Sequence, residues 1–264
     1  MNFQLSGKRA LVTGSTTGVG FAIALELARE GAIVTINGSE PERVAAAVEF
    51  IRSEVNHAQV HGVTADLANA YGIQSLLRQC PKADILVNSL EIIERAPFEK
   101  ITDSEWHRIF DVNVLSGVRL VRHYLPRMKA TNWGRIVFIS DDPGITPSGE
   151  MIHHGMTKAA QTAVSHGLAQ FMVGTGITVN SIRAGQTLSE SVAMVLAKLA
   201  PDQEISIADA EPQRAPQMPQ TSRSDEIIDP TEVPAEMTCI CSPDVAATND
   251  EAQRMVGDAV SSLY

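Results

Sequence analysis

A doubly wound α/β fold with a parallel sheet is the fold class that the sequence predicts. Short β-branched runs alternate with longer stretches of helical period over most of the 264 residues. Parallel strands are joined by right-handed helical crossovers, which cover both faces of the sheet. A mean hydropathy close to zero and a hydrophobic content of 44% suit one globular domain spanning residues 1–264.

Six runs have the length and the β-branched composition of strands. They are Arg9–Thr13, Ala32–Asn37, Ala58–Thr64, Asp84–Asn88, Arg135–Ser140 and Ile177–Ile182. Helices are expected between them, and two of these helices have the start signal of a capping box. The signals are Ser39 with Glu42 and Thr102 with Glu105.

The alternation of strands and helices stops between about residues 190 and 229. Prolines, glutamines and charged residues are frequent there, above all between Ala200 and Asp229. By its position in the chain, this excursion is expected over the carboxyl edge of the sheet, where folds of this class bind ligands. We therefore expect it to form the variable, substrate-side part of the molecule.

Charge and composition limit the function classes. A net charge of −10 and a pI near 5.2 disfavour nucleic acid and anionic lipid as partners, because both need a basic surface. The start of the chain has no signal-peptide pattern, and no run approaches the roughly 18 apolar residues of a membrane span. Cys80, Cys239 and Cys241 lack metal-ligand spacing and predict thiols in a reducing cytoplasm.

Three glycines follow the first strand in the stretch VTGSTTGVGFAIALELA. Gly14, Gly18 and Gly20 lie on a strand-to-helix turn, where the backbone can approach a pyrophosphate and helix-terminal N–H groups can face the anion. A tight turn without a ligand is the plainer interpretation of a glycine triplet. The strand before it and the helix after it favour the nucleotide interpretation.

The pattern resembles the short-chain dehydrogenase/reductase family over nearly the whole chain. The matching positions are Thr13, Gly14, Gly18 and Gly20 in the glycine motif, Asp66 in TADL, Asn88 after the fourth strand, Asn113 in DVNV, and Lys158. The resemblance implies a Rossmann-like fold that binds NAD(P)(H) and moves hydride between the nicotinamide and a carbonyl or alcohol carbon. It also implies an assembly, commonly a tetramer, in which Asp66 holds the adenine and Asn113 and Lys158 belong to the catalytic tetrad.

Departures from the family pattern are concentrated around the expected reaction centre. Counting back from Lys158, the family's catalytic tyrosine position holds His154, and its serine position holds Asp141. Leu90 and Glu91 replace small residues beside the expected nicotinamide site. Ala184-Gly185 stands where a proline-glycine pair is expected, and Val256-Gly257-Asp258 stands where D-G-G is usual.

Three interpretations remain open for this pattern. In the first, the chain is an atypical, non-redox or redox enzyme in which Asp141 and His154 form an acid–base pair. In the second, it is a catalytically inactive partner subunit that assembles with an active relative. In the third, it is an NADP-dependent carbonyl reductase or alcohol dehydrogenase with substituted tetrad residues.

An imidazole at position 154 can act as an acid or a base near neutral pH without help from a neighbour. A carboxylate at position 141 has the wrong sign to hold an oxyanion, so it suits a cationic substrate or one that loses a proton. Glu91 and Asp142 would strengthen this field if they face the pocket. His153 and His154 are adjacent and cannot point the same way, so no metal site is expected.

Cofactor preference depends on the end of the second strand, where Gly38 and Ser39 replace the acidic residue typical of NAD selectivity. NADP(H) is therefore favoured over NAD(H), although a structural nucleotide or an empty site is compatible with non-redox chemistry. The expected cofactor contacts are Gly14, Ser15, Gly18, Gly20, Ser39, Asp66, Asn88, Lys158 and Thr187. A small-molecule substrate and a homotetramer or homodimer are expected, with a hetero-oligomer containing an active relative as the alternative.

Overall fold

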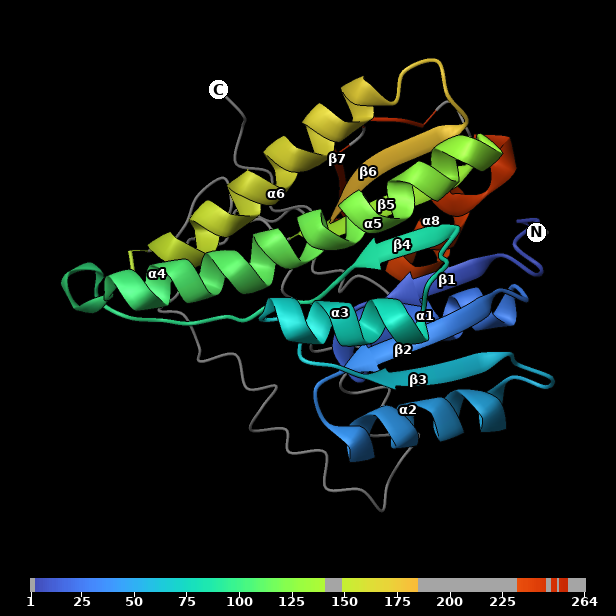
Figure 1. The fold of residues 1–264 in the computed structure, drawn as a ribbon, viewed down its shortest axis with the longest axis horizontal. Helices are drawn as coiled ribbons and strands as arrows, with labels where there is room; N and C mark the ends of the chain where they lie inside the picture. Colours follow the sequence, from blue (N-terminus) through green and yellow to red (C-terminus); the bar gives the residue numbers. More distant parts are fainter. Residues whose placement is uncertain (1–2, 141–148, 185–231, 246–247, 251, 256–264) are drawn as a thin grey trace, which may run out of the picture.

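The fold is a seven-stranded parallel sheet between two layers of helices, as the computed structural model shows (Figure 1). The structure describes the chain except residues 1–2, 141–148, 185–231, 246–247, 251 and 256–264. The strand order is β3-β2-β1-β4-β5-β6-β7, and every neighbouring pair is parallel. The predicted doubly wound α/β class is confirmed.

The strands run in one direction, and the helices between them run back. The strands are β1 (Arg9–Val12), β2 (Ile33–Gly38), β3 (Val60–Thr64), β4 (Ile85–Asn88), β5 (Gly134–Ser140), β6 (Ile177–Ala184) and β7 (Ala252–Met255). The helices are α1 (Gly18–Arg29), α2 (Pro41–Glu54), α3 (Ala70–Gln79), α4 (Asp103–Phe110), α5 (Ser116–Thr131), α6 (Ile152–Phe171) and α8 (Glu232–Cys241). Shorter elements are the 3₁₀ turns η1 (Phe98–Lys100) and η5 (Pro243–Val245) and the π-helical turn η2 (Asp111–Leu115).

Each face of the sheet has its own hydrophobic core. One cluster joins the sheet to α1, α2 and α8, and the other joins it to α3, α5 and α6. The inner strands are almost continuously buried, as in β5, whose seven residues are all buried, whereas three of the five residues of the edge strand β3 are exposed. This is the pattern of a parallel sheet covered on both faces, and it explains why the strand runs lack polar alternation.

The sequence located six strands to within two residues, but it missed β7. Ala252–Met255 has no β-branched residue, and it is a strand because it pairs with β6 from Ser181 to Ala184. Pairing with β6 therefore determines that this segment is a strand, and the β propensity of its residues does not.

One of the two predicted capping boxes is confirmed, and the other is wrong. The Thr102 hydroxyl accepts the Glu105 N–H, and the Glu105 carboxylate accepts the Thr102 N–H at 2.7 Å. The helix predicted to start at Ser39 begins instead at Pro41, with Glu40 as the N-cap and no side-chain cap. Proline fits the first helical turn because it has no N–H to satisfy, and it moves the start beyond the reach of Ser39.

A crevice is expected where the chain turns from one half of the sheet to the other. β1 lies between β2 and β4, so the crossovers from β1 and from β4 diverge at the carboxyl ends of these two strands. Folds of this class bind ligands at such a switch point. The loops that follow β1 and β4 meet there, and both contain residues that the sequence singled out.

Candidate functional site

The glycine turn after β1 lies directly against the loop after β4. Gly14 has φ +59°, and a Cβ at this position would lie 2.8 Å from the Cα of Leu90. A Cβ on Gly20 would lie 2.7 Å from the carbonyl oxygen of Gly14. Gly18, with φ +62° and open space around its Cβ position, is required by the backbone conformation alone. Each of these three positions therefore requires glycine for a different physical reason.

Thr13 fixes the two loops to each other. Its hydroxyl oxygen accepts the N–H groups of Ser89 and Leu90, both at 3.1 Å, and it donates to the Val87 carbonyl at 3.4 Å. The N-cap of α1, Thr17, makes no side-chain cap bond, so no side chain occupies the first amides of this helix from that position. A close backbone turn leading into an uncapped helix start is the arrangement that accepts a phosphate group.

Among the polar residues predicted to hold the nucleotide, Ser15 has a packing role and Ser39 and Asp66 lie at the surface. Ser15 is fully buried, donates to the Val12 carbonyl at 2.7 Å, and accepts the Asn37 N–H at 3.1 Å. Its hydroxyl therefore joins β1 to β2. Asp66 is exposed and accepts the Ala68 N–H at 3.0 Å, while Ser39 is exposed just beyond β2. A Cβ at Gly38 would lie 2.5 Å from Thr16, which leaves no room for a side chain there.

Glu91 forms an ion pair with Lys158 beside His154. The Glu91 carboxylate receives a hydrogen bond from the Lys158 ammonium, and its Oε2 lies 3.7 Å from Nε2 of His154. Lys158 and His154 lie one turn apart on α6 and are both buried, whereas 34% of the Glu91 side chain is exposed. One carboxylate thus contacts the two residues that the sequence placed at the reaction centre.

The charge of Glu91 is fixed by these neighbours. Desolvation alone would raise its pKa, but the Lys158 ammonium and the His154 ring outweigh it and lower the pKa to about 2. Glu91 is therefore a carboxylate at every physiological pH. A charge buried beside its opposite is stable, and the same charge left alone there is costly.

His153 precedes His154 and points into a different environment. Its ring packs edge-on against Trp106, with the centroids 5.8 Å apart, and 1% of the residue is exposed. Burial and the neighbouring His154 lower the pKa of His153, which favours its neutral ring. Across the described residues, no group of three His, Cys, Asp or Glu side chains has the arrangement of a metal site.

Asn113 lies on the π-turn η2, where the helix widens between α4 and α5. Its side-chain oxygen accepts the Ile92 N–H at 2.8 Å, and its Nδ2 donates to the Ile92 carbonyl and to Thr157, both at 3.1 Å. The Asn113 carbonyl accepts the Gln161 amide at 2.6 Å. Asn113 therefore positions the segment after Glu91 against α6.

Two of these partners were not anticipated from the sequence. Thr157 bonds Asn113 and donates to the His154 carbonyl at 2.7 Å, and Gln161 lies one turn after Lys158. The sequence signal that could have identified them is their spacing along one helix, because residues three and four apart share a face.

Asn88 is 4% exposed at the end of β4, and neither polar atom of its side chain has a hydrogen-bond partner within the described part of the chain.

Two predicted site residues, Asp141 and Thr187, lie outside the described residues, as do the excursion at 190–229 and Val256-Gly257-Asp258. The Asp141–His154 pair therefore stays a prediction. Where residues are described, no helix is both long enough and apolar enough to span a membrane.

The fold and the glycine turn define a dinucleotide-binding class of protein, and the chain belongs to the short-chain dehydrogenase family. The profile of that family, described as short chain dehydrogenase, matches residues 8–199. The uncharacterized oxidoreductase YvaG of Bacillus subtilis is 40% identical over the full length of both chains.

Two further comparisons concern the family and the fold, respectively. The D-beta-hydroxybutyrate dehydrogenase of Cupriavidus necator is 34% identical over 200 residues, which are 72% of this chain and 74% of that protein. The crystal structure of L-sorbose reductase from Gluconobacter frateurii, in complex with NADPH and L-sorbose, has a TM-score of 0.81 and covers 100% of both chains at 24% identity. This last likeness shows the shared fold.

Proposed function

We propose that this chain is an NAD(P)(H)-binding enzyme of atypical chemistry, in which His154 exchanges a proton with the substrate and Glu91 and Lys158 set the charge around it. The observation that carries the proposal is the contact of one carboxylate, Glu91, with both Lys158 and His154. An oxidoreductase that is 40% identical over its full length supports a nicotinamide-dependent reaction.

The glycine turn fits a dinucleotide. Side chains at Gly14 and Gly20 would meet the protein's own backbone at 2.8 Å and 2.7 Å, so glycine at these positions keeps the turn tight, and a tight glycine turn before a helix start lets a phosphate approach the backbone. The absence of an acid at Gly38 and Ser39 favours NADP(H) over NAD(H), and the related fold of L-sorbose reductase binds NADPH. A bound nicotinamide would supply or accept the hydride.

The chain's own residues supply the proton step. An imidazole changes charge near neutral pH and can give a proton to a forming alkoxide or take one from an alcohol. Because Lys158 is paired with Glu91, its positive charge is largely cancelled, and it offers a substrate oxygen less stabilisation than a lone ammonium would. Proton transfer through His154 therefore matters more here than a fixed positive field.

Because Glu91 cancels the charge of Lys158, a non-redox reaction is the second candidate. Elimination or isomerisation needs a positioned base and a site that tolerates a carboxylate, and Glu91 provides that carboxylate in contact with His154. Asp141, if it faces His154, would add a second negative charge. Both candidate reactions would use the imidazole of His154. They differ in the cofactor, which would exchange hydride only in the redox reaction.

The other sequence-based predictions extend this proposal. We infer one domain over residues 1–264, with the excursion at about 190–229 on the substrate side, and a cytoplasmic homotetramer or homodimer acting on a small molecule. A hetero-oligomer with an active relative is the alternative assembly. The predicted nucleotide contacts of Ser39, Asp66, Asn88 and Thr187 belong to the proposal, whereas Ser15 is engaged in strand packing.

The test combines nucleotide titration with a histidine variant. NADPH and NADH are titrated by fluorescence, and turnover is measured with L-sorbose and D-β-hydroxybutyrate, the compounds in the relatives' names. His154→Phe is expected to leave nucleotide affinity within about twofold and to lower turnover by about 10²- to 10⁴-fold, the usual contribution of a positioned acid or base. His166→Phe, on the exposed part of the same helix, is the control and should retain the wild-type rate.

Each failure has a separate meaning. Absence of binding to both nucleotides would remove the nucleotide-dependent reaction and favour the partner-subunit interpretation. Nucleotide binding with no oxidation or reduction of the nicotinamide on any substrate would remove the redox part alone. An unchanged rate in His154→Phe would remove the acid–base role of the imidazole.

A further inference from the structure

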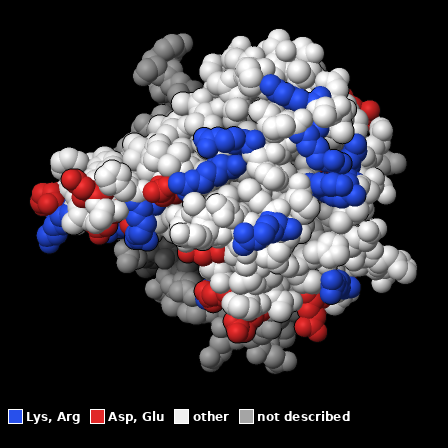
Figure 2. Space-filling model, viewed as in Figure 1, with Lys and Arg blue, Asp and Glu red and all other residues white. Residues whose placement is uncertain are grey.

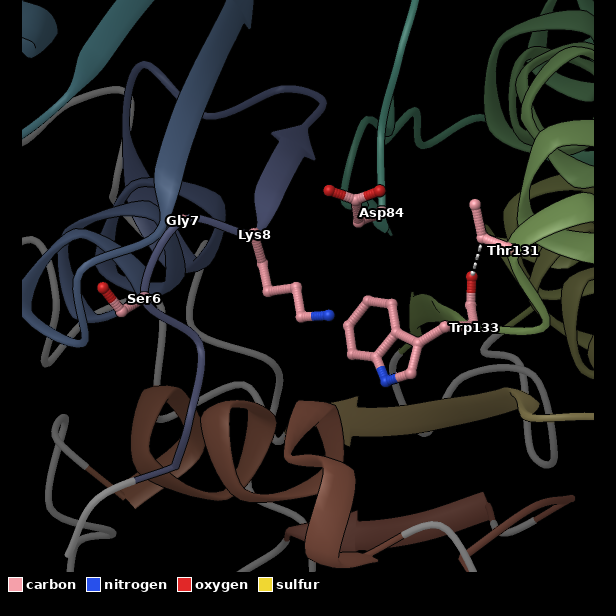
Figure 3. A pocket seen from close by; sticks show the side chains of 6 residues that line it. All are labelled: Ser6, Gly7, Lys8, Asp84, Thr131 and Trp133. Carbon is pink, nitrogen blue, oxygen red and sulfur yellow. Dashed lines mark hydrogen bonds between the residues drawn. The ribbon is translucent and has the colours of Figure 1, made fainter.

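A hollow at the amino edge of the sheet lies apart from the site around Glu91 (Figure 3). It measures about 410 Å³ and is lined by Ser6, Gly7, Lys8, Asp84, Thr131 and Trp133. Lys8, Asp84 and Trp133 directly precede β1, β4 and β5, and the starts of parallel strands share one edge of a sheet, opposite to the glycine turn. The volume falls in the range of roughly 300 to 1,000 Å³ that is usual for small-molecule sites.

Two opposite charges line this hollow without forming an ion pair with each other. Among the described residues that line it, only Lys8 and Asp84 are charged, and they are not within 4.0 Å of one another. The Lys8 ammonium lies instead 3.7 Å from the centroid of the Trp133 ring. Figure 3 shows the Lys8 side chain reaching toward that ring, with the Asp84 carboxylate standing apart from both. The hollow therefore offers a cation, an anion and an aromatic ring to one small ligand.

The Asp84 carboxylate is held in place and keeps one oxygen for a ligand. Its Oδ2 accepts the Arg9 N–H at 2.9 Å, and its own N–H donates to the Arg9 carbonyl at 2.8 Å. Its Oδ1 has no hydrogen-bond or ion-pair partner among the described residues. A donor on a ligand can therefore bind this oxygen without breaking a contact within the protein.

The Lys8 backbone is fixed as firmly. Gly7 has φ +75° and donates its N–H to the Gly31 carbonyl at 3.0 Å. Lys8 donates its N–H to the Leu5 carbonyl at 3.0 Å, and its carbonyl accepts the Ile33 N–H at 2.8 Å. The ammonium has three N–H donors, so the contact with Trp133 leaves donors for a carboxylate.

The Trp133 ring packs against a buried cation. The guanidinium carbon of Arg135 lies 4.7 Å from the ring centroid, and Arg135 is 1% exposed. Its guanidinium donates to the carbonyls of Gly134, Gly176 and Ser242. The ring thus rests on a rigid support, and a preorganised wall reduces the ordering cost of binding.

We propose that this hollow binds an α-amino acid with a large apolar side chain. The carboxylate of the ligand contacts the Lys8 ammonium, its ammonium contacts Asp84 Oδ1, and its side chain packs on Trp133. A ligand with one charge fits less well, because a monoanion at Lys8 meets the Asp84 carboxylate and a monocation at Asp84 meets the Lys8 ammonium. An uncharged ligand would desolvate both charges without pairing them.

Charges outside the hollow do not select this ligand. Figure 2 shows Lys and Arg side chains over the centre and right of one face, with Asp and Glu toward its left and lower margins, and the chain as a whole has a net charge of −10. A zwitterion has no net charge, so this long-range field neither attracts nor repels it. Contacts inside the hollow therefore set its affinity.

The experiment uses the fluorescence of Trp133 in the full chain. Trp106→Phe removes the other of the two tryptophans, so the signal comes from Trp133 alone. L-phenylalanine is titrated at fixed ionic strength beside phenethylamine, which lacks the carboxylate, and hydrocinnamate, which lacks the ammonium. The amino acid is expected to bind with a Kd of about 1 mM, and each analogue about tenfold or more weakly.

Variants of the two charged residues should change this selectivity in opposite directions. Lys8→Met is expected to weaken phenylalanine binding about fivefold and to strengthen phenethylamine binding, because the repelling ammonium is gone. Asp84→Asn is expected to weaken phenylalanine binding to a similar extent and to strengthen hydrocinnamate binding. Asparagine keeps an oxygen for the Arg9 N–H, and circular dichroism melting checks that both variants fold.

Matched controls are Lys100→Met and Glu99→Gln, which make the same charge changes on the exposed turn η1 and should bind all three compounds like the parent. Equal binding of the three compounds by the parent would overturn the proposal, as would the absence of a saturable signal with phenylalanine. Phenylalanine binding that neither Lys8→Met nor Asp84→Asn alters would place the ligand elsewhere. Tighter binding of hydrocinnamate than of phenylalanine would overturn the ligand class in favour of a simple anion.

Discussion

The two edges of the sheet treat positive charge in opposite ways. At the carboxyl edge, Lys158 is 2% exposed and is paired with Glu91 beside His154. At the amino edge, Lys8 lines an open hollow, and among the described residues no carboxylate lies within 4.0 Å of the Lys8 ammonium. A buried charge must be paired because desolvation is costly, whereas a hydrated charge can remain unpaired. Pairing therefore accompanies burial of the lysine at the carboxyl edge, whereas the Lys8 ammonium beside an open hollow needs no carboxylate partner.

The same substitution at both edges gives the largest expected contrast. Lys158→Met leaves the Glu91 carboxylate without its ammonium, and we expect a loss of about 2 to 3 kcal/mol in the free energy of unfolding, at the low end for a buried pair because Glu91 is 34% exposed. Lys82→Met, at an exposed position, is expected to stay within about 0.5 kcal/mol. Urea denaturation measures both.

A double variant tests the cause of the Lys158 effect. Lys158→Met/Glu91→Gln removes both charges and should recover much of the lost stability, because no unpaired carboxylate remains. A Lys158→Met protein as stable as Lys82→Met would show that the Glu91–Lys158 pair contributes nothing, and the contrast between the two edges would fail.

Two glycines with left-handed backbone give the next contrast. Gly14→Ala combines the cost of φ +59° with a Cβ 2.8 Å from the Leu90 Cα, and we expect a loss of about 2 kcal/mol in stability. Gly7→Ala has φ +75° with no atom within 4 Å of its Cβ, so about 1 kcal/mol is expected. Thermal melting measures the stability of both variants.

Nucleotide affinity separates these two variants further. Gly14→Ala should weaken NADPH binding by about tenfold or more, because the Leu90 loop must move away from the turn, and Gly7→Ala should not change it. Equal affinities in the two variants would mean that the glycine turn does not contact the nucleotide.

Much of the fold could be predicted because it follows from local composition. The buried β-branched runs located six strands, and the Thr102–Glu105 spacing located the start of α4. β7 could not be found, since AQRM has no strand pattern and depends on pairing with β6. The start of α2 moved from Ser39 to Pro41 because the proline outweighs the capping signal.

The site was predicted less completely, because side-chain contacts arise between distant elements. The glycine turn was located as a motif, yet the tight contact between Gly14 and Leu90 joins loops 76 residues apart. Glu91 was a candidate from its position, but its pairing with Lys158 spans 67 residues and leaves no sequence pattern. Ser15 looked like a phosphate ligand, and only the packing of β1 against β2 reveals where its hydroxyl is used.

Acid titration gives the smallest and most specific test of the paired edge. The pKa of Glu91 falls from 4.5 to about 2 on folding, so the unfolded chain takes up this proton at a higher pH than the folded protein does. The stabilisation from Glu91 is therefore complete above pH 4.5 and is lost as the pH falls through 4.5 toward 2. Urea denaturation of the wild type and of Glu91→Gln across this range should give a stability difference that shrinks steadily with falling pH, since all other carboxyl groups titrate in both proteins. A difference independent of pH would mean that Glu91 gains nothing from its charge, and the carboxyl edge would then owe its stability to packing alone.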